Sequence, residues 1–148
     1  METALTSSSP SIRGKWTLES RDNVDAFLAC RGVSWFVRTM ILGLKADIEY
    51  LDGSEPNSIV KRTLSRMGTR EETLPYPGHY EPARTLSGKP EVGDVFFETD
   101  QIVVQEMKWK DSGLVVARIE RKVVGEKLNV TFKCEDIVAT EVYAKIPG

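Results

Sequence analysis

The chain has 148 residues, of which 41% are hydrophobic and 28% charged, a balance typical of one globular domain that excludes a largely disordered chain. Its 20 basic and 22 acidic side chains give a formal charge of −2, so no positive excess favours a nucleic-acid partner. Its single histidine, His79, excludes metal sites that need two histidines, and we predict neither a metal site nor a cofactor.

The start of the chain is polar and contains no apolar run, so it is not typical of a secretory signal. We predict a flexible tail over 1–11 and one domain over 12–148. No stretch reaches the length needed to cross a bilayer, and we expect a cytoplasmic protein. Cys30 and Cys134 are predicted to be free, partly buried thiols, because two cysteines make neither a disulfide framework nor a metal site.

In the first part of the domain, the spacing of the apolar residues changes from that of a strand to that of a helix. Alternation over 14–21 predicts a strand. Apolar side chains then recur at helical spacing, which predicts a helix over 21–32 that Asp22 or Asn23 can cap. A second apolar stripe predicts another short helix over 34–45. The two helices are joined by a tight link.

The rest of the chain has turn signals about every ten residues, a spacing typical of short strands. We predict nine further strands, over 46–51, 58–66, 69–74, 80–86, 93–99, 101–109, 114–123, 127–135 and 137–146. Neighbouring strands should pair antiparallel because no helix intervenes, and a sheet of this size must close or curl. The predicted fold is all-β: a ten-stranded antiparallel up-and-down β-barrel capped by a helix–turn–helix lid. Such a barrel has room for a small ligand.

Four motifs, IRGKW, NVDAFLACRGVSWFVR, QEMKW and TEVYAKI, follow one another along the chain. Their order and spacing, from Ile12 to Ile146, resemble the intracellular lipid-binding protein family, which includes fatty-acid-binding and retinoid-binding proteins. The chain departs from the family pattern in having Ile12 where phenylalanine is usual. The resemblance implies a water-filled cavity and a non-enzymatic carrier that moves a long-chain fatty acid or related hydrophobic ligand through the cytoplasm. Nothing in the sequence indicates oligomerisation, so we predict a monomer.

The resemblance also implies a site for the ligand's head group. In many family members two arginines and a tyrosine hold the fatty-acid carboxylate, and the last two belong to an R-x-Y motif in the final strand. Here that motif reads Glu141-Val142-Tyr143, so the arginine is replaced. Family spacing assigns the other arginine to Arg121 or Arg118. Strand parity places Arg118 on a uniformly charged face, so we predict that Arg121 points inward.

Parity in the last strand, taken alone, favours Glu141 on the outside. The resemblance reverses this, and we predict that Arg121, Glu141 and Tyr143 all face the interior as ligand-binding residues. Glu141 would then form an ion pair with the guanidinium of Arg121 and repel the carboxylate of a ligand. Either a fatty acid binds with its carboxylate elsewhere, or the preferred ligand has a neutral polar head.

Further ligand contacts are predicted from the apolar pattern. The wall residues are expected on the first helix, the link and the penultimate strand: Val24, Phe27, Leu28, Val33, Trp35, Val130 and Phe132. A portal is expected at Met40, Ile41, Leu44 and Met67. Basic side chains near the lid favour a transient contact with anionic membranes.

Two other functions compete with the carrier. The first is a barrel filled by its own side chains that acts as a protein interaction module. The second is an enzyme that uses Glu141, Arg121 and Tyr143 as an acid–base cluster, although no nucleophile or metal set accompanies these residues.

Overall fold

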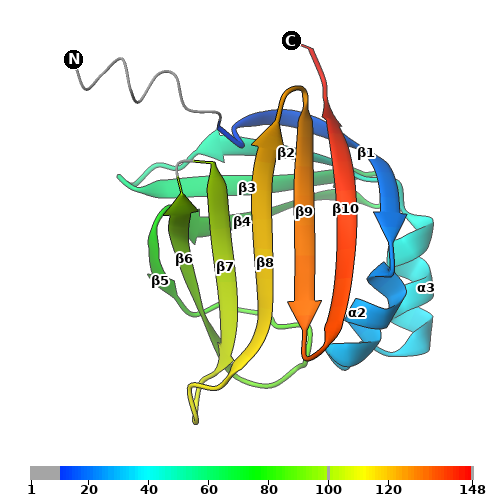
Figure 1. Cartoon of the computed structure of the whole chain (residues 1–148), viewed down its shortest axis with the longest axis vertical. Coiled ribbons are helices and arrows are strands. Elements are labelled where there is room, and N and C mark those ends of the chain that lie inside the picture. The colour runs from blue at the N-terminus through cyan, green and yellow to red at the C-terminus, as the bar shows by residue number, and fades with distance from the viewer. Residues whose placement is uncertain (1–10, 100, 148) are drawn as a thin grey trace.

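The computed structural model describes residues 11–99 and 101–147, which form ten strands and two helices (Figure 1). The strands are β1 (Gly14–Asp22), β2 (Asp47–Asp52), β3 (Ser58–Ser65), β4 (Gly68–Pro75), β5 (Gly78–Tyr80), β6 (Glu91–Thr99), β7 (Ile102–Trp109), β8 (Val115–Val124), β9 (Lys127–Cys134) and β10 (Ile137–Lys145). The helices are α2 (Val24–Cys30) and α3 (Trp35–Gly43). Apart from Ser11, the predicted tail lies outside the described residues.

The strands form one antiparallel sheet in the order β4-β3-β2-β1-β10-β9-β8-β7-β6-β5. The sheet curls until its edge strands, β4 and β5, contact each other, and the result is a nearly closed barrel. Both helices lie at one end of it (Figure 1). The structure thus confirms the predicted antiparallel barrel with a helix–turn–helix lid, which comprises α2, α3 and the link over 31–34. Neither described helix is long and apolar enough to span a bilayer.

The predicted strand over 80–86 is wrong. The structure has the three-residue strand β5 instead, followed by irregular backbone over 81–90. Pro82 and Pro90 lack the N–H group that a central strand needs. Within this loop the Gly88 amide donates to the Thr85 carbonyl, and the Thr85 hydroxyl donates to the Lys89 carbonyl, so the backbone folds on itself.

Alternation along the strands separates the interior of the barrel from its outer surface. In β10 the side chains of Ala139, Glu141 and Tyr143 are buried, whereas Val138 is 50% exposed. The inward orientation of Glu141 implied by the family resemblance is therefore correct, and the outward one favoured by parity alone is wrong.

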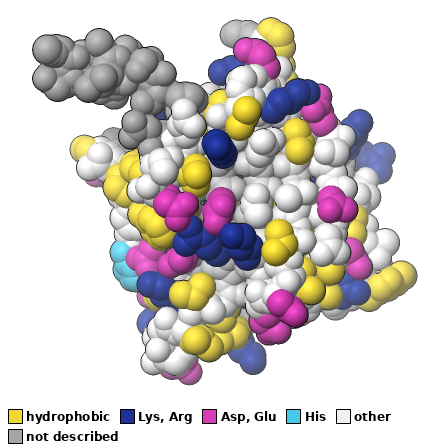
Figure 2. All heavy atoms as spheres, in the orientation of Figure 1, with side chains coloured by type: hydrophobic (Ala, Val, Ile, Leu, Met, Phe, Trp, Pro, Cys, Tyr) yellow, Lys and Arg dark blue, Asp and Glu magenta, His cyan; other side chains and the backbone are white. Residues whose placement is uncertain are grey.

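The outer face of β6–β8 carries charges of both signs, visible as adjoining basic and acidic groups in Figure 2. Arg118 belongs to this face and pairs with Glu106 at 3.0 Å.

Two groups of buried apolar side chains lie inside the barrel and beneath the lid. One lies between the strands and is centred on large side chains such as Trp16, Tyr50 and Leu128. The other lies beneath α2, where Phe27 packs on Phe132 with ring centroids 5.1 Å apart. The second group fixes α2 on the end of the barrel.

The start of α2 differs in detail from the predicted cap. Asn23 occupies the N-cap position but has a left-handed backbone (φ 63°), and its side chain makes no capping hydrogen bond. Its amide Nδ2 instead donates to the Val138 carbonyl at 3.0 Å, which ties the helix start to β10. In α3 the Ser34 hydroxyl accepts a capping bond from the Val37 amide at 3.4 Å.

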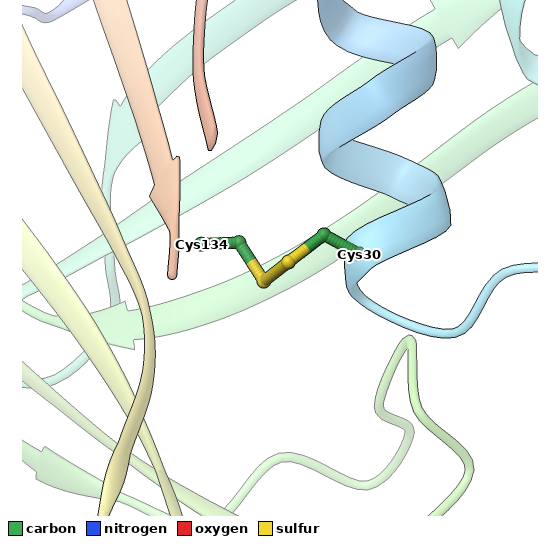
Figure 3. Close-up of a disulfide and its surroundings, with 2 residues drawn as sticks. All are labelled: Cys30 and Cys134. Atoms are coloured by element: carbon green, nitrogen blue, oxygen red, sulfur yellow. A yellow bond between two sulfur atoms is a disulfide. The ribbon is translucent and has the colours of Figure 1, made fainter. Parts of the chain in front are cut away.

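Cys30 and Cys134 form a disulfide (Figure 3), so the prediction of two free thiols is wrong. Cys30 ends α2 and Cys134 ends β9, and their Cα atoms are 6.2 Å apart, within the range that a disulfide spans. A count of cysteines cannot reveal this pairing, because only the folded topology brings together residues separated by 104 positions. The bond attaches α2 covalently to the barrel.

Candidate ligand-binding site

Arg121 is at the centre of a buried polar cluster inside the barrel. Its side chain comes from β8 and is 5% exposed. Its Nη1 donates to Gln105 Oε1 at 2.9 Å, and Gln105 Nε2 donates to the Tyr80 hydroxyl at 2.6 Å. The Tyr80 hydroxyl in turn donates to Met107 Sδ at 3.6 Å. We call Arg121, Gln105 and Tyr80 the Arg121 cluster.

The guanidinium of Arg121 retains an unused donor. Its Nε is buried and has no hydrogen-bond partner within residues 11–99 and 101–147. Its hydrogen-bonded neighbour, Gln105, is a neutral amide, and the ring of Tyr50 lies 6.0 Å from the guanidinium carbon. A buried cation is unfavourable unless it is paired, so a guanidinium with an unused donor is suited to an anion that accepts hydrogen bonds from it.

Tyr80 remains a neutral hydroxyl in this cluster. Burial raises its pKa to about 12, and the hydrogen bond from Gln105 only partly offsets that effect. The hydroxyl can therefore both accept from Gln105 and donate to Met107. Gly93 in β6 makes room for the Tyr80 ring, because a Cβ atom at this position would collide with it.

Glu141 belongs to a second buried cluster, which we call the Glu141 cluster. Its carboxylate is held through both oxygens: Oε1 accepts from the Tyr143 hydroxyl at 2.7 Å and Oε2 from Arg21 Nε at 3.0 Å. Burial, reinforced by the negative charge of Glu141, raises the pKa of Tyr143, which therefore stays protonated and donates. The predicted pairing of Glu141 with Arg121 is wrong, because Arg21 stands directly opposite Glu141 in the β1–β10 register.

Sequence reasoning missed Arg21, and strict alternation explains why. Trp16 and Leu18 point inward, so an unbroken strand would turn Arg21 outward. An irregularity in the β1–β10 register between Leu18 and Ser20 shifts the parity, and Arg21 joins the interior side. The sequence contains no clear signal for this bulge.

The predicted wall residues fall into two groups. Six of them are buried or partly buried inside the barrel or beneath the lid: Val24, Phe27, Leu28, Val33, Val130 and Phe132. Trp35 is 69% exposed and lies on the outer surface of the lid, so its predicted interior position is wrong. It is the first residue of α3, and none of the nine residues of that helix is buried. A ligand contact by any of the six stays a prediction.

The predicted portal residues come together only in part. Met40 and Leu44 of the α3 end lie next to Met67 of the β3–β4 turn, and they line a pocket of about 260 Å³. Thr39, Gly43 and Arg66 complete its lining. Ile41 packs against the apolar group beneath α2 and does not line this pocket.

Comparisons with known proteins agree with this architecture. No protein-family model matches the chain. A fatty acid-binding protein of Schistosoma japonicum is 23% identical over 137 residues, which cover 92% of this chain and 98% of that protein. The crystal structure of Echinococcus granulosus fatty-acid-binding protein 1 aligns with a TM-score of 0.78 at 22% identity, covering 92% of this chain and 98% of the other.

A second solved structure, the Schistosoma mansoni fatty acid binding protein in complex with arachidonic acid, aligns with a TM-score of 0.77 at 23% identity, covering 95% of this chain and 99% of that one. The chain therefore has the fold of the fatty-acid-binding proteins. This is the fold that the motifs predicted, and the chain is also similar in sequence to one of these proteins along most of its length.

Proposed function

We propose that this protein is a carrier that binds a long-chain fatty acid inside the barrel, with the ligand's carboxylate at Arg121. The observation that carries this proposal is the buried guanidinium, whose Nε has no partner within the described part of the chain. A bound carboxylate would supply an acceptor for that nitrogen and a negative charge beside the cation, and its two oxygens match the fork of an arginine.

The replacement of the usual arginine by Glu141 does not oppose this assignment. Glu141 is engaged by Arg21 and Tyr143, so it leaves the guanidinium of Arg121 open. The reason to prefer a ligand with a neutral head, or a carboxylate bound elsewhere, was the assumed Glu141–Arg121 pair, and that pair does not form. The fatty-acid ligands named for the similar proteins add support for an acidic head group.

The acyl chain would supply most of the binding free energy. Apolar burial is worth about 0.8 kcal/mol per methylene, so a chain of sixteen to eighteen carbons gains on the order of 10 kcal/mol before ordering costs. The side chains that we propose to contact it are those that face the interior: Val24, Phe27, Leu28, Val33, Val130 and Phe132.

We further propose that the ligand enters beside α3, at the pocket lined by Met40, Leu44 and Met67. Met40 and Met67 are exposed at this entrance, and Arg66 adds a positive charge. Trp35 and Phe36 are exposed on the same helix as Met40. Exposed apolar side chains next to a basic one suit a transient contact with an anionic membrane. We propose a monomer that carries its ligand through the cytoplasm without catalysing a reaction.

Mass spectrometry of an organic extract from the purified protein tests the carrier function against the alternative of a filled barrel that binds only protein partners. We expect about one molecule of acyl lipid per protein molecule, and saturable binding of palmitate after the lipid has been removed. A lipid-free extract together with an absence of saturable palmitate binding would favour the interaction module.

A further inference from the structure

Arg21 connects the wall of the barrel to the end of α3. Its Nε donates to Glu141 Oε2 at 3.0 Å on β10. Its Nη1 donates to the Leu42 carbonyl at 3.1 Å, and its Nη2 donates to the Leu44 carbonyl at 3.4 Å. Leu42 lies in the last turn of α3 and Leu44 is its C-cap residue, so one guanidinium joins two elements.

This connection is chemically favourable for the helix. The last carbonyl groups of a helix have no intrahelical donor and carry partial negative charge, so a cation stabilises them. Glu141 neutralises the same guanidinium on its other side and is itself fixed by the Tyr143 hydroxyl. The guanidinium is thereby held in one orientation, with two of its nitrogens directed at α3.

The two lid helices are attached to the barrel to different extents. In α2, three apolar side chains are buried and Cys30 is bonded to Cys134. The C-cap residue Arg31 forms a buried ion pair with Glu91 at 2.7 Å. By contrast, none of the nine described residues of α3 is buried, and four of its apolar side chains are more than two-fifths exposed: Trp35, Phe36, Val37 and Met40. Ile41 and Leu42 pack against the apolar group beneath α2. Among the described contacts, Arg21 is the barrel side chain that hydrogen-bonds to the α3 end.

We infer that Arg21, positioned by Glu141, is a latch that holds the C-terminal end of α3 on the barrel and so limits how often the adjoining pocket opens to a ligand. The gating part of this inference rests on the proposed carrier function, whereas the attachment of α3 does not. Glu141 thus has a positioning role, rather than a role in binding the head group.

Hydrogen exchange of the ligand-free protein tests the latch without any fatty acid. We expect the amides over 39–44 to exchange about tenfold faster in both Arg21→Gln and Glu141→Gln, since each variant loses charge-assisted hydrogen bonds. Amides of α2 should exchange as in the wild type. The matched control is Glu19→Gln, which removes an exposed ion pair of the same strand with Lys127 and should leave α3 unchanged. Unchanged exchange of α3, or equal acceleration throughout the protein, would overturn the latch.

A charge swap separates the latch from a simple ion pair. The double variant Arg21→Glu/Glu141→Arg can keep the ion pair but cannot donate from position 21 to the Leu42 and Leu44 carbonyls. We expect α3 to exchange as fast in it as in Arg21→Gln; wild-type exchange would overturn the inference.

Stopped-flow binding of the fluorescent fatty acid cis-parinaric acid tests the gating. We expect association and dissociation to accelerate together, by about tenfold, in Arg21→Gln. An unchanged association rate in a variant whose α3 exchanges faster would overturn the gating role. Absence of cis-parinaric acid binding by the wild type would instead contradict the carrier function.

Discussion

Arg121 and Gln105 lie on neighbouring strands of the barrel, and Arg121 Nη1 donates to Gln105 Oε1 at 2.9 Å. The amide of Gln105 is oriented by its other hydrogen bond, which it donates to the Tyr80 hydroxyl. The neutral amide fixes the position of the guanidinium without neutralising it. This relationship explains how a cation can stay buried and still be available to an anionic ligand.

The substitution Gln105→Leu should destabilise the protein, because it removes the acceptor of Arg121 and the donor to Tyr80. We expect a loss of about 1–3 kcal/mol in the free energy of unfolding, the cost of leaving buried polar groups without partners. Urea denaturation measures this loss. Asn129→Leu, at an exposed position of β9, is the control and should change stability by less than about 0.5 kcal/mol. Equal effects of the two substitutions would contradict the role of Gln105.

Removing one charged partner of the buried Arg31–Glu91 pair should lower the free energy of unfolding substantially. Its side chains are 5% and 0% exposed, so Glu91→Leu leaves an uncompensated charge and should cost about 3–5 kcal/mol in urea denaturation. The double variant Arg31→Met/Glu91→Leu should recover most of that loss. Glu81→Leu breaks an exposed pair with Lys110 and should cost at most about 1 kcal/mol. A double variant that is as unstable as Glu91→Leu would rule out this explanation.

Reduction of the Cys30–Cys134 bond should lower the melting temperature. A disulfide that closes so long a loop is expected to stabilise a protein by about 2–4 kcal/mol, largely by restricting the unfolded chain. Thermal unfolding with and without dithiothreitol measures the difference. The double variant Cys30→Ser/Cys134→Ser should not respond to the reductant. The same melting temperature for the oxidised and reduced wild type would contradict this stabilisation.

Tyr80 should make stability depend on pH in the alkaline range. Its folded-state pKa is raised to about 12, above the unfolded value of about 10, so its contribution is fully present below pH 10 and is lost as the pH rises through 12. The contribution is on the order of 2 kcal/mol. Chemical denaturation across this range should show a smaller decline for Tyr80→Phe than for the wild type. Parallel declines would mean that Tyr80 titrates as a free tyrosine.

The sequence was sufficient to predict the barrel because each of its signals is local. Turn residues at regular intervals separate the strands, and a change of hydrophobic period reveals the helix pair. Parity identified Arg121 correctly as an inward side chain, since Arg118 and its neighbours form a uniformly charged outer face.

The features that escaped prediction depend on contacts between distant segments. The Cys30–Cys134 bond requires the end of α2 to meet the end of β9. The Arg21–Glu141 pair depends on a bulge and on the register of β1 with β10. Trp35 carries an apolar side chain that the pattern assigns to the core, yet α3 lies outside the barrel and leaves it exposed.

Competitive displacement of cis-parinaric acid by palmitate and by its methyl ester, in wild type and Arg121→Gln, is the most direct test of the account. The two competitors share an acyl chain and differ in the charge of the head group. We predict that the wild type prefers palmitate by roughly 10- to 100-fold, the value of a charge-assisted hydrogen bond, and that Arg121→Gln removes this preference. Arg118→Gln, on the outer face, should retain it. An undiminished preference for palmitate in Arg121→Gln would contradict the assignment of the carboxylate to Arg121.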